Sequence, residues 1–283
     1  DGIFWIASKE GLNRLDTTSE SFERFSKNPT YPSGLFEDFI TALLKDRKGN
    51  FWVGTALGGL YLFDPKTVSF ISYRHDPANP QSLACNQINK LAEDPFGRIW
   101  VGTTGGFSLD RFDPDTGIAE HLGIVYPNEG HPNIMSLHVD SSGRLWYGSW
   151  GYGLYCYNPA DGTYRNYRND PTNPFSIPSN IVHCVVQDKE GWFWIGTRNG
   201  GLCILDPQTE QFHSVKLVLK TDPNAIVDTV LDIYRDPQGI LWLGTLDDGV
   251  CRYDSNREQI LYIKNNPKDP NSLNENRIYA LCI

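Results

Sequence analysis

The sequence predicts an all-β fold assembled from one four-stranded unit that recurs along the chain. Tryptophans stand at nearly even intervals, with spacings of 47, 48, 46, 48 and 48 positions from one to the next. Short segments rich in Val, Ile, Leu, Trp and Tyr surround each of them, and no segment has a sustained helical period of apolar residues. Four-stranded units at this interval are typical of β-propeller blades. The tryptophans are Trp5, Trp52, Trp100, Trp146, Trp194 and Trp242.

The second repeat shows the expected strands, named A to D in chain order. An Asp-x-x-Gly sequence, Asp46 to Gly49, suits a type I turn and predicts the A–B hairpin. An Asp-Pro-x-Thr sequence beginning at Asp64 predicts the C–D connection, because proline presets the backbone angle there. The four predicted strands are residues 41–46 (TALLKD), 50–55 (NFWVGT), 59–64 (GLYLFD) and 69–74 (SFISYR).

The recurring Trp-x-Gly phrase has a structural interpretation. One blade cannot bury both faces of its sheet, so it stacks on its neighbours. A tryptophan at one fixed place in each blade fills the space between blades, and the glycine two residues later leaves room for a close approach of backbone or ring. We therefore expect these tryptophans to build the frame and not to bind a ligand.

The two ends of the chain predict how the repeats are divided. The chain begins with DGIFWIAS, inside an A–B hairpin, and ends with RIYALCI (277–283), which aligns with FITALLK (39–45). We expect a single domain over residues 1–283, with five whole blades and a sixth shared between the ends. Pairing of the C-terminal strand A with the N-terminal strand B would close a six-bladed ring without an open edge. The alternative is a fragment of a seven-bladed propeller.

A second repeat pattern, with a period of two blades, is superimposed on the first. Pro-rich inserts occupy the link from strand D to the next strand A in every other repeat, which gives the chain a threefold character. Proline makes such links rigid. The inserts are HDPANPQSL (75–83), NDPTNPFSI (169–177) and NNPKDPNSL (265–273).

Composition and charge exclude several classes of function. The net charge of -9 argues against binding of nucleic acid, and no apolar run is long enough for direct membrane insertion. The six cysteines form no CxxC pair and none has metal-ligand spacing beside a histidine, so we expect strand fillers, no metal and no cofactor. None of the six histidines forms an obvious acid–base pair with a carboxylate, which favours binding over catalysis.

The combined motifs resemble a known repeat. Asp-x-x-Gly-x-x-Trp-[Val/Ile/Leu]-Gly-Thr, then Gly-Leu, then Asp-Pro, with the Asp-Pro-x-Asn-Pro-x-Ser-Leu link, resembles the two-component regulator propeller repeat along the whole chain. The resemblance implies the periplasmic sensor region of a bacterial hybrid histidine kinase anchored in the inner membrane. It also implies downstream immunoglobulin-like and kinase domains, oligosaccharide ligands and a signal-competent homodimer. The alternatives are an enzyme similar to the streptogramin lyases and a protein-interaction scaffold.

Candidate ligand-binding residues lie in the B–C loops, here called the loop rim. In propellers these loops share one face with the D–A links, and their residues differ from repeat to repeat whereas the frame residues recur. Exposed aromatic groups suit stacking on a sugar ring, and Arg, Asn and Asp suit hydrogen bonds to hydroxyl groups. Solvated loops and packing on a neighbouring blade would give the same pattern. The rim candidates are Trp150, Tyr152, Arg198, Asn199, Asp247 and Asp248, and His183 at the start of an A strand joins them.

The polar residues at the A-strand starts have two alternative roles, as caps of a turn or strand end or as ligand-binding groups. A recurring Asn or Asp at this place caps a turn or strand end more often than it binds a ligand. The residues are Asp38, Asn86, Asn133, Asn180, Asp228 and Asn276.

Overall fold

The computed structural model describes residues 3–19, 21–25, 39–104, 109–122, 133–219, 222–254 and 259–281. The secondary structure of these residues consists of β-strands, turns and bends, without α-helix. None of the described segments is a helix that could span a membrane. The chain divides into two compact units, residues 1–134 and 135–283.

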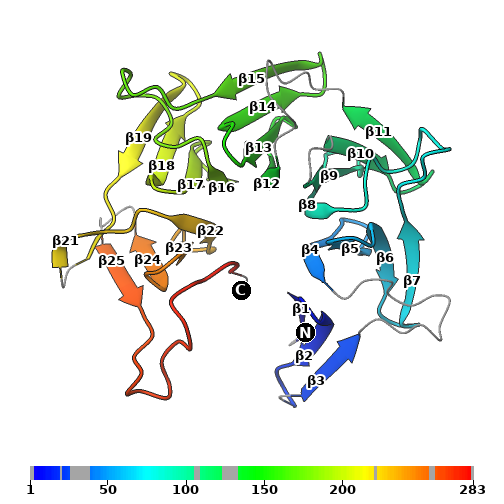
Figure 1. Ribbon diagram of the computed structural model, residues 1–283, viewed down its shortest axis with the longest axis horizontal. Coiled ribbons are helices and arrows are strands. Elements are labelled where there is room, and N and C mark those ends of the chain that lie inside the picture. Colours follow the sequence, from blue (N-terminus) through cyan, green and yellow to red (C-terminus); the bar gives the residue numbers. More distant parts are fainter. Residues whose placement is uncertain are drawn as a thin grey trace. The chain divides into compact units, whose positions relative to one another are not determined.

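The first unit holds three antiparallel sheets whose strands follow one another in sequence order (Figure 1). The N-terminal sheet has three strands, in agreement with a chain that begins at strand B, and the next two sheets have four. The strands are β1 (Ile3–Ser8), β2 (Gly11–Asp16) and β3 (Ser21–Phe25); β4 (Ile40–Lys45), β5 (Phe51–Thr55), β6 (Leu60–Asp64) and β7 (Ser69–Tyr73); and β8 (Ile88–Glu93), β9 (Ile99–Thr103), β10 (Leu109–Asp113) and β11 (Ile118–Leu122).

The second unit adds three four-stranded sheets with the same order (Figure 1) and one two-stranded hairpin that the sequence did not predict. The sheets are β12 (Ile134–Val139), β13 (Leu145–Ser149), β14 (Leu154–Asn158) and β15 (Thr163–Tyr167); β16 (Val182–Gln187), β17 (Phe193–Thr197), β18 (Gly201–Asp206) and β19 (Gln211–Val215); and β22 (Val230–Arg235), β23 (Leu241–Thr245), β24 (Val250–Asp254) and β25 (Gln259–Ile263). The hairpin is β20 (Val218–Leu219) with β21 (Asp222–Ile226).

The predicted fold class is confirmed: the protein is a β-propeller of six antiparallel repeats, of which five have all four strands A to D within the described residues and the N-terminal one has three. The predicted strands of the second repeat differ from β4 to β7 by one residue or less at each end. The pairing of the last strand with the N-terminal blade involves Cys282 and Ile283, which lie outside the described residues, so ring closure and the single domain stay predictions.

Four of the six repeat tryptophans are buried in the core, and Trp5 and Trp242 are partly buried. Trp52, Trp100 and Trp146 are at most 2% exposed. Four of the repeat tryptophans have a polar partner that the sequence did not predict, the Asp of the preceding Asp-x-x-Gly turn. The indole Nε1 of Trp52 donates a hydrogen bond to Asp46 at 2.9 Å, and the same bond recurs from Trp146 to Asp140, from Trp194 to Asp188 and from Trp242 to Asp236.

The first residue of the next A strand packs closely against the glycine of Trp-x-Gly. A Cβ atom on Gly148 would lie 2.6 Å from Val182 Cγ1, and one on Gly196 would lie 2.8 Å from Val230 Cγ1. Ile278 is placed in the same way, because its carbonyl oxygen would lie 2.8 Å from a Cβ atom on Gly244. The C-terminal segment therefore starts as an A strand would, although residues 277–281 have no strand assignment.

The three Pro-rich inserts have the same internal hydrogen bonds. Asn86 and Asn180 each accept a hydrogen bond at 2.8 Å on Oδ1 from the first amide of the preceding insert, and Asn276 accepts the third at 2.7 Å. Their carbonyl oxygens accept from Gly59, from Gly151 and Gly153, and from Gly249. These asparagines therefore cap the turns, as the sequence predicted.

The cysteines of the described residues are buried and form no disulfide bond: Cys85, Cys156, Cys184, Cys203 and Cys251. Burial raises the pKa of the Cys156 thiol to about 11 and that of the Cys251 thiol to about 12. A protonated, buried thiol is inert and acts as a small apolar group. These five cysteines fill space between strands, as expected from the sequence.

Candidate functional site

The second unit holds all seven candidate residues of the loop rim. The B–C loop that follows β13 is fixed by its backbone. Trp150 forms an isolated bridge with Ile181, and the amides of Gly151 and Gly153 both donate to the carbonyl of Asn180, at 3.0 and 2.8 Å. Gly153 has φ +82°, and a Cβ atom there would collide with the carbonyl oxygen of Tyr167. The loop therefore presents Trp150 on a rigid support.

Trp150, His183 and Arg198 come together at this rim, and we call them the rim cluster. The Arg198 guanidinium carbon lies 5.2 Å from the centroid of the Trp150 ring, within range of a cation–π interaction. The imidazole ring of His183 meets the same indole edge-on, with 5.9 Å between the centroids. Trp150 is 42% exposed although both neighbours hold it, so it is an ordered aromatic surface open to solvent.

His183 belongs to this cluster because strand β16 contains a bulge. The register of β16 against β17 shifts between Val182 and Cys184, and the residue left between them is His183. A bulge leaves one residue outside the ladder and re-aims its side chain. The buried His183 thereby contacts a tryptophan from the preceding blade, 33 positions earlier in the chain.

Tyr152 and Asn199 lie beside the cluster but have other partners. The Arg168 guanidinium carbon lies 6.0 Å from the centroid of the Tyr152 ring. The backbone carbonyl of Tyr152 accepts a hydrogen bond from Asn166 Nδ2 at 2.9 Å. Asn199 has φ +59°, and its amide donates to Thr229 Oγ1 at 3.2 Å. Asparagine tolerates this left-handed conformation, which gives Asn199 a local turn role.

Asp247 and Asp248 form ion pairs of their own. Asp248 accepts from Lys264 Nζ at 2.7 Å, and Asp247 lies 3.7 Å from an Arg277 guanidinium nitrogen. Exposed pairs of this kind contribute about 0–1 kcal/mol and exchange easily. Within the described residues there is no group of three or more His, Cys, Asp or Glu side chains that could hold a metal ion.

The rim cluster can bind a ligand by three kinds of contact. The exposed indole face offers stacking to a ring, the guanidinium donates hydrogen bonds to hydroxyl or anionic groups, and the imidazole can donate or accept. Each group reaches the cluster from a different loop or strand, so no short motif encodes it. The sequence identified the residues from their variation between repeats, and the bulge that turns His183 toward Trp150 gave no sequence signal.

Comparison with protein families gave one match. The family described as "Two component regulator propeller" matches residues 34–56, 82–105, 176–199 and 226–247. Each matched segment covers an A–B hairpin: β4–β5, β8–β9, β16–β17 or β22–β23. Four separate hairpins with this signature support a shared repeat unit. No curated protein matches the sequence.

Solved structures share the fold. The extracellular domain of a hybrid two component system from B. thetaiotaomicron superposes with a TM-score of 0.81 at 24% identity, over 99% of this chain and 35% of that one. PorZ, a surface component of the type-IX secretion system of Porphyromonas gingivalis, has a TM-score of 0.73 at 18% identity, over 99% and 42%. A virginiamycin B lyase from Staphylococcus aureus has a TM-score of 0.62 at 14% identity, over 84% and 72%. This chain therefore spans less than half of the first two proteins.

Proposed function

We propose that this chain, which is built of two-component regulator propeller repeats, is the sensor propeller of a bacterial two-component signalling protein. The family match and the likeness to the extracellular domain of a hybrid two component system support this proposal. A sensor needs a surface that binds a signal molecule and does not need to transform it. The rim cluster is such a surface, because its groups suit binding.

The proposed ligand is an oligosaccharide held against Trp150. The observation that carries this proposal is the exposed indole, fixed between the Arg198 guanidinium and the His183 ring. A sugar presents an apolar ring face and a periphery of hydroxyl groups, which match an indole flanked by hydrogen-bonding side chains. A support that is already ordered lowers the entropic cost of binding.

The proposed setting is extracytoplasmic. In this proposal the propeller precedes immunoglobulin-like and kinase domains in a parent protein that is anchored in the inner membrane and signals as a homodimer. The likeness to an extracellular domain supports the location. Ligand binding at the rim would then shift the population of signalling states across the parent protein.

A thermal-shift screen against plant and host oligosaccharides tests the proposal. We expect at least one saccharide to raise the melting temperature with a dependence on its concentration, as for a ligand that binds only the folded state. Trp150→Ala and Arg198→Ala should each remove this stabilisation. Their unliganded melting temperatures should change little, because Trp150 is exposed and Arg198 is a loop residue.

Tyr164→Ala is the control, because Tyr164 is an aromatic residue exposed to a similar extent, 41%, and lies in strand β15, paired with Tyr157 and away from the B–C loop. Binding should survive this change. Stabilisation that persists in both rim variants would contradict the proposed site. Turnover of a streptogramin that required a metal ion and a histidine would instead support a lyase, and a folded protein that binds none of the saccharides would support an interaction scaffold.

A further inference from the structure

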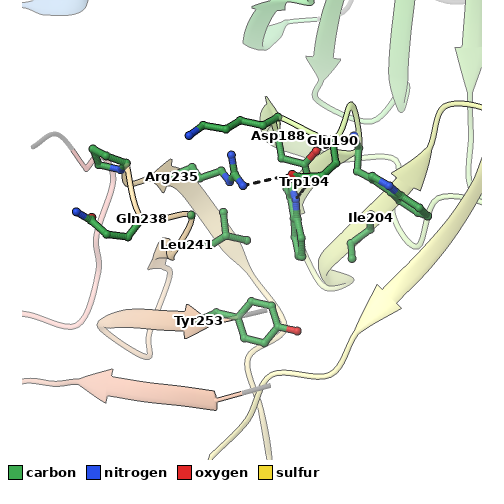
Figure 2. Close-up of a pocket in the computed structure, with 12 residues that line it drawn as sticks. Asp188, Glu190, Trp194, Ile204, Arg235, Gln238, Leu241 and Tyr253 are labelled. Atoms are coloured by element: carbon green, nitrogen blue, oxygen red, sulfur yellow. Dashed lines mark hydrogen bonds and ion pairs between the residues drawn. The ribbon is translucent and has the colours of Figure 1, made fainter. Parts of the chain in front are cut away.

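A second cavity lies at the opposite ends of strands β16, β17, β22 and β23 from the loop rim. It has a volume of about 580 Å3 and opens between the blade β16–β19 and the blade β22–β25. Figure 2 shows Trp194 and Ile204 on one side, and Arg235, Gln238 and Leu241 on the other. The strands run about 17 Å between the two ends, at roughly 3.3 Å per residue, so this cavity is distinct from the rim cluster.

The cavity exists because one junction between blades lacks a hydrogen bond that other junctions have, from a turn amide of one blade to a side-chain oxygen of the next blade. The amide of Arg47 donates to Glu93 Oε2 of the next blade at 3.0 Å, and the amide of Ser141 donates to Gln187 Oε1 at 3.1 Å. The equivalent position in the blade β22–β25 is Arg235. A guanidinium has no acceptor atom, so it cannot bind the turn amide in this way.

Arg235 instead extends to Glu190, with 3.4 Å between its guanidinium nitrogen and the carboxylate oxygen. Figure 2 shows this pair at the mouth of the cavity. The Glu190 side chain is 64% exposed, so the pair contributes little and another carboxylate can replace it. The Arg235 side chain is 21% exposed, which places a partly desolvated cation beside the opening.

The apolar part of the cavity results from a smaller side chain at an equivalent position. Phe193 packs on Trp146 with 4.2 Å between ring centroids, but the residue at that register position opposite Trp194 is Leu241. The space beside the Trp194 ring is therefore wider, because leucine is a smaller side chain than phenylalanine. Trp192, 37% exposed, adds a second indole to the lining, and Gln238 adds an amide.

We propose that this cavity binds a small ring-shaped carboxylate. The Arg235 guanidinium binds the ligand carboxylate through charge-assisted hydrogen bonds, and the ligand replaces the Glu190 carboxylate there. The ring lies against the Trp192 and Trp194 side of the cavity, and Gln238 donates to or accepts from a ring substituent. A uronic acid and an aromatic carboxylate share this chemistry. The site does not depend on the proposed function of the rim.

Isothermal titration calorimetry of the 283-residue protein with D-glucuronate and with benzoate tests the proposal. Glucose and benzyl alcohol are the neutral controls. We expect saturable binding of at least one carboxylate and none of its neutral counterpart, and the acid that binds identifies the source. Binding of neither acid, or equal binding of acid and neutral analogue, would overturn the proposal.

Two variants locate the binding. Arg235→Gln restores the acceptor found at Gln187, so the fold should keep its melting temperature while the carboxylate affinity falls by about tenfold or more, the size expected for a lost charged hydrogen bond. Leu241→Phe copies Phe193 and should narrow the cavity beside the Trp194 ring, with a similar loss of affinity. Arg165→Gln is the control, because Arg165 forms an exposed ion pair with Glu210 outside both sites, and this variant should bind as the wild type does. Unchanged affinity in both cavity variants would overturn the assignment.

Discussion

At the scale of single residues, the Asp of four of the Asp-x-x-Gly turns does more than form the turn. In the fourth repeat Asp140 accepts the Ser142 and Arg144 amides, each at 2.9 Å, and also the indole of Trp146 at 2.9 Å. One carboxylate therefore closes the A–B hairpin and orients the tryptophan that packs against the next blade. Burial acts to raise the pKa of Asp140, but the hydrogen bonds from Trp146, Ser142 and Arg144 outweigh it, and the pKa is lowered from 3.8.

This lowered pKa predicts how stability depends on pH. Because the folded protein binds the Asp140 proton less tightly than the unfolded chain does, the stabilisation is present above about pH 4 and is lost as pH falls through the lowered folded pKa. Asp140→Asn should cost about 1–3 kcal/mol of unfolding free energy at neutral pH and should flatten the acid limb of the stability curve. Urea denaturation across the acid range measures both effects.

Trp146→Phe is the companion variant, since it removes the indole donor and keeps an aromatic ring. Without the indole donor, the pKa of Asp140 should rise toward its ordinary value, so stability should be lost at a higher pH. This change in the acid limb should be smaller than the one caused by Asp140→Asn. Stability curves that run parallel for the wild type and Asp140→Asn over the whole range would show that this carboxylate has no part in acid stability.

At the scale of elements, strand positions could be predicted because each rests on local chemistry. The Asp-x-x-Gly turn, the Asp-Pro turn and the short apolar segments between them are set by residues close in sequence. The contact of Trp-x-Gly with the next A strand could be expected only in outline. The atom that approaches Gly196 most closely across the blade junction is Val230 Cγ1, 34 positions later.

Gly196→Ala tests this junction. The new Cβ would lie 2.8 Å from Val230 Cγ1 and 2.9 Å from the Val230 carbonyl oxygen, and it would also collide with Cys184 Sγ. Overpacking of this kind costs about 1–3 kcal/mol of unfolding free energy, which chemical denaturation will measure. Adding Cys184→Ala should relieve part of the collision, so the double variant should be more stable than the sum of the two single losses implies. Strict additivity would refute the steric explanation.

The candidate sites show what sequence patterns could not reach. The rim residues stood out because their loops vary between repeats, but the meeting of Trp150, His183 and Arg198 depends on a bulge in β16 and on the stacking of neighbouring blades. No sequence motif marks the cavity beside Arg235. Position 235 offers no hydrogen-bond acceptor and position 241 offers no aromatic ring, whereas Gln187 and Phe193 supply these groups at the equivalent positions of the preceding blade. Such sites are found by comparing equivalent positions in three dimensions.

At the scale of the whole molecule, the repeat predicts a ring in which the C-terminal segment completes the first blade. Strand β1 pairs with β2 along one edge, and the described part of the chain assigns no strand to the other edge of β1. If residues 277–283 pair with β1, the outer β1 amides are protected from exchange, and deleting 277–283 will expose them. Hydrogen–deuterium exchange of the β1 peptide in full-length and truncated protein measures this. Equal exchange in both would favour a fragment of a longer propeller.

The most direct test of the sensor proposal is fluorine NMR on protein labelled with 5-fluorotryptophan, with the Trp150 resonance assigned from Trp150→Phe. Titration with the saccharide found in the thermal-shift screen should move the Trp150 resonance saturably. The buried Trp146 resonance should stay in place, because that indole is 2% exposed and is held by Asp140. A saccharide that binds while the Trp150 resonance stays unchanged would contradict the assignment of the rim cluster as the sensing site.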